Sequence, residues 1–503
     1  MGIIIKQSVR QSVVQYIGIG IGLLSTLFIY PLALSEIGLL RFIINTAQLV
    51  TPFSLLGTQV LAVRFFPTFR DEQSRHHGFL TLLQGIALVG VLLFAALYFA
   101  FSEQFAGLFS DQPAEYLPYL PYAVPLVFFM VFNFLYTSYA TNFHKVLYPA
   151  IFNELLVKIG LPVLVLLYFL KWITLADMMN GMLLVFLAVM VAQILYLMSL
   201  GQFSLAPPQR SFLTPSLRKE LFQFGSVNIL SNWGYVLSNR IDIFMLGLLL
   251  GPGAFQGVGI YSILFIISEV IDTPRKALVN ISSPIIAQAW KDHDLPHLKE
   301  LYEKSSLNQF IVGGLLFIGI WAGLDGLFVL MPNGDLIAQS RWVVFFLGLS
   351  KVIDMLAGVN NIIIQHSRYY RFNFYSVVLL AVINILNNLW LIPVKGILGA
   401  AIATFISVVL YNLARFIFLW VKMGMNPLTF RTLVVLGTGL LALGLGYLVP
   451  IPASSSWLAL AGLIGRSVVI AGVYLGIVLY FRISSDLNDL IGKTLGSRQN
   501  RKR

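Results

Sequence analysis

The chain has 503 residues, of which 58% are hydrophobic and 11% are charged, whereas soluble globular chains carry about 25% charged residues. Its mean hydropathy is +0.84, so much of this apolar surface has to face lipid rather than water. The net charge is +12, and the absence of cysteine excludes disulfides, a thiol nucleophile and a thiolate metal site. These values together exclude a water-soluble fold.

Long apolar runs favour spanning helices over a closed β-barrel. Residues 78–101 and 432–449 come close to the ~20 residues that a spanning helix needs, and they lack the alternation of barrel strands. The first residues lead into an apolar run without a cleavage pattern, so we expect the first helix to be part of the fold. The sequence predicts an all-α polytopic transmembrane helix bundle with about 14 spans.

In chain order, apolar windows bounded by charges and Pro or Gly clusters give the expected spans. They are 11–30, 37–63, 78–101, 117–142, 146–170, 174–198, 221–250, 255–289, 306–329, 338–364, 372–393, 397–421, 432–449 and 457–481.

Lysine and arginine alternate in density from one predicted loop to the next. With a cytosolic N-terminus, the inside segments hold about 21 of these residues and the outside loops about two, Lys171 and Lys395. Because a missed helix would scramble this alternation, the pattern supports an even number of spans, with both termini cytosolic. We expect a multi-pass protein of a bacterial inner membrane, and we interpret the basic C-terminal tail as a membrane anchor that binds no nucleic acid.

The spacing of the spans predicts two six-helix lobes related by a pseudo-two-fold axis, plus two C-terminal helices. The expected parts are an N-terminal lobe (1–201), a cytosolic linker (202–216), a C-terminal lobe (217–422), two further spans (423–482) and a basic cytosolic tail (483–503). The residues after the first span weakly resemble those after the seventh. Parallel repeats of this kind are typical of transporters that bind their substrate between the halves.

Motifs of soluble enzymes are missing from the sequence. There is no phosphate-binding GxxxxGK[ST] pattern and no HExxH pattern, and the six histidines fall in predicted cytosolic loops or at helix ends. We therefore expect no catalytic residues, no cofactor and no metal site.

Ionisable residues at membrane depth are the informative ones, because they are costly there and have to face a partner, a cavity or water. Glu154 with Lys158 and Lys351 with Asp354 have the spacing of pairs on one helix face, and Asp272 meets Arg275 and Lys276 in the same way. Each pair fits either a structural clamp or a role in the cavity. The candidates for binding a coupling ion or for gating are the carboxylates Glu154, Glu269, Asp272 and Asp354.

Arg240 and Asp242 are two residues apart, so on a helix they point away from each other and each requires a partner elsewhere. They belong to a polar stripe in the seventh span that also contains Asn232 and Asn239. A stripe this polar usually lines water or faces other polar groups, which makes these four residues candidates for binding substrate. Arg41, near an end of the second span, is interpreted as snorkelling to the headgroups.

Several stretches resemble the oligosaccharide flippases of the polysaccharide biosynthesis group, within the multidrug, oligosaccharidyl-lipid and polysaccharide (MOP) exporter superfamily. The likeness covers nearly the whole chain. The stretches are 239–247 (NRIDIFMLG), 259–262 (GIYS), 284–291 (PIIAQAWK), 396–404 (GILGAAIAT) and 152–158 (FNELLVK).

This resemblance implies a two-lobed bundle that moves an undecaprenyl-pyrophosphate-linked oligosaccharide from the inner to the outer leaflet by alternating access. The basic cavity residues of the family would correspond here to Arg240, Lys158 and Lys351. Expected partners are the lipid-linked oligosaccharide, membrane lipids, a coupling cation (H⁺ or Na⁺) and other membrane proteins that assemble polysaccharide.

Four alternatives remain open at this point. Two are relatives within the superfamily: an exporter of drugs or cations of the MATE type, and the flippase of the lipid precursor of peptidoglycan. The third is a membrane enzyme such as a sugar polymerase, although the longest outside loop, 102–116, has no Lys or Arg. The fourth is a structural scaffold, which would have little reason to keep so many ionisable residues at depth.

Overall fold

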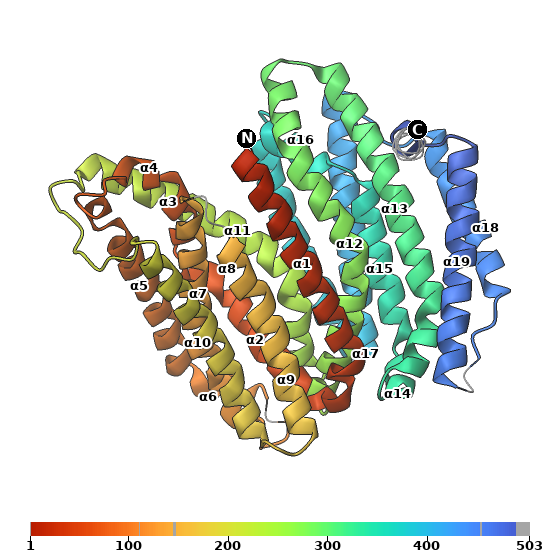
Figure 1. The fold of residues 1–503 in the computed structure, drawn as a ribbon, viewed down its shortest axis with the longest axis horizontal. Helices are drawn as coiled ribbons and strands as arrows, with labels where there is room; N and C mark the ends of the chain where they lie inside the picture. Colours follow the sequence, from red (N-terminus) through yellow and green to blue (C-terminus); the bar gives the residue numbers. More distant parts are fainter. Residues whose placement is uncertain (1, 110, 144–146, 453–454, 489–503) are drawn as a thin grey trace, which may run out of the picture. The chain divides into compact units, whose positions relative to one another are not determined.

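The computed structural model describes residues 2–109, 111–143, 147–452 and 455–488. Within these ranges, the side chains of 2–13, 227–235, 237–239, 277 and 280 are not part of the description. The described residues form helices and no strand, which confirms the predicted all-α class (Figure 1).

The following helical elements lie between residues 2 and 249. They are α1 (Gly2–Phe28), η1 (Tyr30–Ala33), α2 (Leu34–Ser54), α3 (Thr58–Arg64), α4 (Phe66–Phe69), η2 (His76–Gly78), α5 (Phe79–Ala100), α6 (Ser102–Gly107), η3 (Leu117–Tyr122), α7 (Ala123–Thr141), α8 (Leu147–Ile151), η4 (Phe152–Leu156), α9 (Val157–Phe169), α10 (Leu175–Ser199) and α11 (Pro215–Leu249).

The remaining helices complete the described chain. They are α12 (Ala254–Lys291), α13 (Leu295–Leu330), α14 (Gly334–Ala338), α15 (Arg341–Leu356), α16 (Asn360–His366), α17 (Tyr370–Met423), α18 (Phe430–Tyr447) and α19 (Ser456–Tyr480).

The number of membrane spans agrees with the sequence pattern. Ten helices among the described residues are long and apolar enough to cross a membrane, and α15 and α16, bent by 50°, form an eleventh candidate. Helix α17 has 54 residues, or about 80 Å of helix, which is far more than the ~30 Å hydrocarbon core. Gly396 breaks it in a conformation that only glycine adopts readily (φ 60°, ψ −138°), so it supplies two spans. With α1 and α11, the total is about fourteen.

The expected span 37–63 is wrong as a single helix. Helix α2 ends at Ser54, and α3 begins at Thr58 after two residues of positive φ, Leu56 (46°) and Gly57 (79°). Pro52 lies in the last turn of α2, so the backbone near this end already lacks one hydrogen-bond donor. The left-handed residues then redirect the chain before α3.

The chain folds into two compact units, residues 1–262 and 263–503, each of which is described by itself below. The boundary falls within α12. The predicted lobes are defined by a repeat in the sequence, whereas these two units are defined by contacts within the fold. The division into lobes, linker and tail therefore stays a prediction. Residues 489–503 of the tail lie outside the described residues.

The first unit is organised around α2, which packs against α5, α7 and α11. Where α2 crosses the start of α12, the two backbones touch. A Cβ at Gly38 would collide with the carbonyl of Phe255, and one at Gly259 would collide with the carbonyl of Leu34. Glycine is required at this crossing because any side chain would push the helices apart.

The start of the segment predicted as a linker is fastened to the first unit by two histidines. His76 Nε2 lies 2.7 Å from Gln202 Oε1, and His77 Nδ1 lies 2.7 Å from Gln209 Oε1. The ring of His77 also stacks on Phe212 at 4.0 Å. Both histidines have positive φ, a conformation that non-glycine residues adopt only at a cost, so these contacts also stabilise a strained turn.

In the second unit, α18 and α19 lie side by side against α13 (Figure 1). Arg466 in the middle of α19 is 6% exposed and joins α19 to α13 and to the segment that follows α18. Its Nη1 donates to the carbonyl of Ala322 (2.7 Å), and its Nη2 donates to the carbonyl of Val449 (2.7 Å). The two C-terminal spans are therefore an integral part of this unit.

We predict that Gly38→Ala lowers the thermal stability of the detergent-solubilised protein by about 1–3 kcal/mol, because the new methyl group meets backbone that cannot move aside. The matched control is Gly85→Ala in α5, where a Cβ meets nothing within 4 Å. Thermal unfolding of both variants checks this, and equal unfolding temperatures would contradict the close crossing of α2 and α12.

Candidate functional site

In the first unit, polar side chains from α2, α11 and α12 meet at membrane depth. Arg240 Nη1 is 3.4 Å from Asn45 Oδ1, and Asn45 Nδ2 donates to the carbonyl of Arg41, one turn earlier on α2 (2.7 Å). Asp242, which is 4% exposed, accepts a hydrogen bond from the hydroxyl of Tyr261 at 3.0 Å. Arg240 and Asp242 thus have different partners, as their spacing predicts.

Arg41 belongs to this group, which the sequence did not indicate. Its guanidinium lies 4.9 Å from the centre of the Tyr30 ring, and its Nε atom is buried without a hydrogen-bond partner among the described residues. The snorkelling interpretation rested on its place near a helix end. The signal that was available is the i,i+4 spacing to Asn45, which puts both side chains on one face of α2.

The two asparagines of the predicted stripe, Asn232 and Asn239, lie in α11, but their side chains are outside the described residues. Their role in binding substrate stays a prediction.

Glu154 and Lys158 form the ion pair that their spacing predicts. Glu154 lies in η4, a π-helical turn between α8 and α9, and both side chains are about one-third exposed. A Cβ at Gly18 of α1 would come within 3.4 Å of atoms of both side chains, so α1 covers the pair closely. The geometry fits a clamp between α1 and the fifth span.

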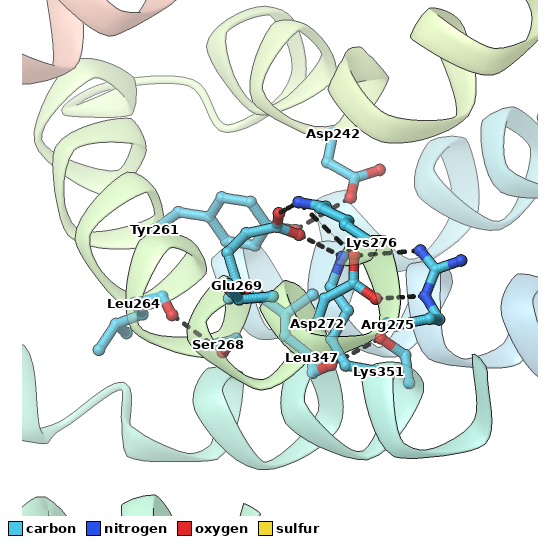
Figure 2. A network of polar contacts seen from close by, with 12 residues as sticks. Asp242, Tyr261, Leu264, Ser268, Glu269, Asp272, Arg275, Lys276, Leu347 and Lys351 are labelled. Carbon is cyan, nitrogen blue, oxygen red and sulfur yellow. Dashed lines mark hydrogen bonds and ion pairs between the residues drawn. The ribbon is translucent and has the colours of Figure 1, made fainter. Parts of the chain in front are cut away.

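In the second unit, five charged side chains of α12 and α15 form one network, which Figure 2 shows. Lys351 of α15 forms an ion pair with Glu269 of α12, and Lys276 donates to the other oxygen of Glu269 at 3.0 Å. Arg275 holds Asp272 through two nitrogens: Nε, and Nη2 at 3.0 Å. Lys276 Nζ also lies 3.6 Å from Asp272 Oδ2.

The ion pair that Lys351 forms is with Glu269, instead of the Asp354 that the local spacing suggested. Asp354 accepts a hydrogen bond from Asn412 Nδ2 of α17 at 2.7 Å. Helix α15 packs against α17, which brings Asn412 to Asp354 and leaves Lys351 to reach α12. The partners of Lys351 and Asp354 therefore depend on how the helices pack, and not on spacing within one helix.

A buried arginine extends this polar region toward α17. Arg415 is 2% exposed, donates to Ser376 Oγ at 3.2 Å and to the side-chain oxygen of Asn373, and lies 3.9 Å from the centre of the Tyr411 ring. Arg415 was not among the predicted site residues, because it lies in an apolar span without a charged residue three or four positions away.

Among the site residues named above, cations outnumber carboxylates by one in each unit. They are Arg41, Lys158 and Arg240 against Glu154 and Asp242 in the first unit, and Arg275, Lys276, Lys351 and Arg415 against Glu269, Asp272 and Asp354 in the second. Among the described residues, no group of three or more His, Asp or Glu side chains is arranged to hold a metal ion.

Comparison with known proteins identifies a family. A family model described as "Polysaccharide biosynthesis protein" matches residues 8–290, which is more than half of the chain and includes α11 and most of α12. Comparison with the sequences of curated proteins finds no match.

Two solved structures share the fold. An inward closed conformation of the lipid II flippase MurJ superposes with a TM-score of 0.68 at 13% identity, covering 92% of this chain and 98% of that one. An inward-facing MATE multidrug transporter of the MOP superfamily gives a TM-score of 0.59 at 15% identity, covering 82% of this chain and 97% of that one. At such identities the likeness shows the fold.

The network predicts an order of stabilities. Glu269→Gln leaves the buried Lys351 without its carboxylate and should lower the free energy of unfolding by about 3–5 kcal/mol. Lys351→Gln should cost less, because Glu269 keeps Lys276. Denaturant unfolding in detergent measures both variants.

The control is Glu300→Gln, which removes an exposed ion pair with Lys304 and should leave stability unchanged. If Lys351→Gln costs as much as Glu269→Gln or more, Glu269 is not the centre of the network.

Proposed function

This chain belongs to the polysaccharide biosynthesis protein family, and on that premise we propose that it is a flippase for a lipid-linked oligosaccharide. Its cargo would be an undecaprenyl-pyrophosphate-linked oligosaccharide used for surface polysaccharide, moved from the inner to the outer leaflet of a bacterial cytoplasmic membrane. Both termini would be cytosolic, as the positive-inside pattern predicts.

The observation that carries this proposal is the position of two arginines around Asn45. Arg240 contacts Asn45 directly, and Arg41 lies one turn away with an Nε atom that has no partner among the described residues. A guanidinium presents several donors in a planar fork that matches phosphate oxygens. Two such groups at membrane depth suit a pyrophosphate, which carries its charge through an apolar medium.

Movement of this substrate does not require an ATP site. The lipid tail can remain in hydrocarbon while the sugar passes along a polar path between the predicted lobes, which would open alternately to either side. With the cell interior negative, outward movement of the pyrophosphate gains roughly 2.3 kcal/mol per charge per 100 mV. The carboxylates Glu154, Glu269, Asp272 and Asp354 are the proposed sites for a coupling H⁺ or Na⁺ and for gating.

The family and the similar structures are transporters, and we propose accordingly that this chain catalyses no covalent reaction and needs no cofactor. Lys158 and Lys351 both engage carboxylates of their own helix or a neighbouring one, so they support the site by position. Other membrane proteins that assemble polysaccharide would receive the product.

A second candidate is flipping of the peptidoglycan lipid precursor. The superposition on MurJ, which covers nearly all of both chains, favours it. Both substrates pair a polyprenyl pyrophosphate with sugars, so the arginine site fits either one. Cell lysis on depletion would indicate the peptidoglycan precursor, whereas loss of surface polysaccharide without lysis would indicate the oligosaccharide.

We predict that Arg240→Lys weakens the binding of undecaprenyl-pyrophosphate oligosaccharide about tenfold or more, because lysine cannot donate two parallel hydrogen bonds to phosphate. Purified protein in liposomes with a fluorescent lipid-linked oligosaccharide gives both affinity and flipping rate.

The matched control is Arg218→Lys on the same helix, where the arginine donates to the carbonyl of Leu213 at 2.9 Å. It should flip lipid at the normal rate. Full affinity in Arg240→Lys would remove arginine recognition of the pyrophosphate from the proposal, and no flipping by the unaltered protein would contradict the proposed function itself.

A further inference from the structure

The charged network around α12 contains one more cation than carboxylate. Two carboxylates of this helix, Glu269 and Asp272, are contacted by three cations, Lys351, Arg275 and Lys276. Hydrocarbon penalises an uncompensated charge of either sign, so a surplus positive group at this depth calls for an explanation.

Two of the cations, Lys351 and Arg275, each form the more buried ion pair of one carboxylate. Lys351 has an 11% exposed side chain and reaches Glu269 from a neighbouring helix. Arg275 grips Asp272, whose side chain is 3% exposed, with two nitrogens. Removing either cation would leave a largely buried carboxylate with a weaker partner, which is costly.

Lys276 differs from both in exposure and in its contacts. Its side chain is 53% exposed, and its ammonium is shared between Glu269 Oε2 at 3.0 Å and Asp272 Oδ2 at 3.6 Å (Figure 2). If it moved away, Glu269 would keep Lys351 and Asp272 would keep Arg275. The ammonium sits on a flexible four-carbon stem, so it can move without displacing a helix.

Counting the charged side chains of the second unit in and beside this network leads to the same residue. Asp354 accepts a hydrogen bond from Asn412 and interacts electrostatically with Arg275 and with Arg415. Three carboxylates, Glu269, Asp272 and Asp354, then balance Lys351, Arg275 and Arg415. Lys276 is the cation whose departure leaves this set neutral.

We infer that Lys276 is an anion-binding arm: it leaves Glu269 and Asp272 to bind a phosphate group of the substrate and returns to them when the substrate departs. The two carboxylates keep the ammonium charged and positioned while no substrate is bound. This inference rests on the proposed function, since the phosphate group would be that of a polyprenyl pyrophosphate.

The absence of cysteine permits a direct test, because Lys276→Cys creates a single thiol in the full-length protein. We expect this variant to bind undecaprenyl pyrophosphate at least about tenfold more weakly, the loss typical of a charge-assisted hydrogen bond. Modification with aminoethyl methanethiosulfonate, which restores an ammonium, should return the affinity to within about twofold of the original. The neutral methyl methanethiosulfonate should not restore it.

Bound undecaprenyl pyrophosphate should also slow the modification of Lys276→Cys, since the phosphate would occupy the surroundings of the thiol. The unfolding temperature should stay close to that of the unaltered protein, because the side chain of Lys276 is 53% exposed and the two carboxylates keep their more buried partners, Lys351 and Arg275. The matched control is Lys351→Cys, which loses a largely buried cation of the same carboxylate. It should react slowly and unfold at a clearly lower temperature.

Several results would overturn the inference. If Lys276→Cys binds the lipid as tightly as the unaltered protein, or if the neutral reagent restores binding as well as the charged one, Lys276 is not an anion-binding arm. A thiol that does not react would place the side chain toward lipid. A fall in unfolding temperature like that of Lys351→Cys would make Lys276 structural. If the unaltered protein fails to bind undecaprenyl pyrophosphate, the proposed function falls together with the inference.

Discussion

A charged side chain inside a bilayer finds no partner in the hydrocarbon, and this constraint determines how the helices of this chain are placed around one another. Glu269 illustrates it. The carboxylate is held by Lys276 of its own helix and by Lys351 of α15, so α15 has to pack where its lysine reaches α12. Asp354 imposes the same condition on α17 through Asn412. The contacts that make the charges tolerable are also those that fix the helix neighbours.

The positions of the spans could be predicted from the sequence because the hydrocarbon core requires each spanning helix to be apolar over about 20 residues. The predicted span 174–198 corresponds to Leu175–Ser199, and 457–481 corresponds to Ser456–Tyr480. The break between α2 and α3 could not be predicted. It depends on left-handed backbone at Leu56 and Gly57, and a leucine carries no signal for that conformation. Hydropathy continues across it without interruption.

The sequence identified many residues of the candidate site but fewer of the contacts between them. Helical spacing identified the pair Glu154 and Lys158, because both partners stand on one turn. It misassigned Lys351, whose ion-pair partner lies on another helix, since sequence spacing reports only neighbours within a helix. Arg41 was missed for a related reason. Its position near a helix end was explained by snorkelling, and the sequence does not show that α11 places Arg240 beside Asn45, one turn from Arg41. Contacts between helices depend on packing that a single sequence does not display.

The proposed transport of a lipid-linked oligosaccharide is tested most directly by the sidedness of that lipid in cells depleted of the protein. We expect undecaprenyl-linked oligosaccharide to accumulate on the cytosolic leaflet while surface polysaccharide disappears and the cells remain intact. A normal distribution between the leaflets, with normal surface polysaccharide, would contradict it.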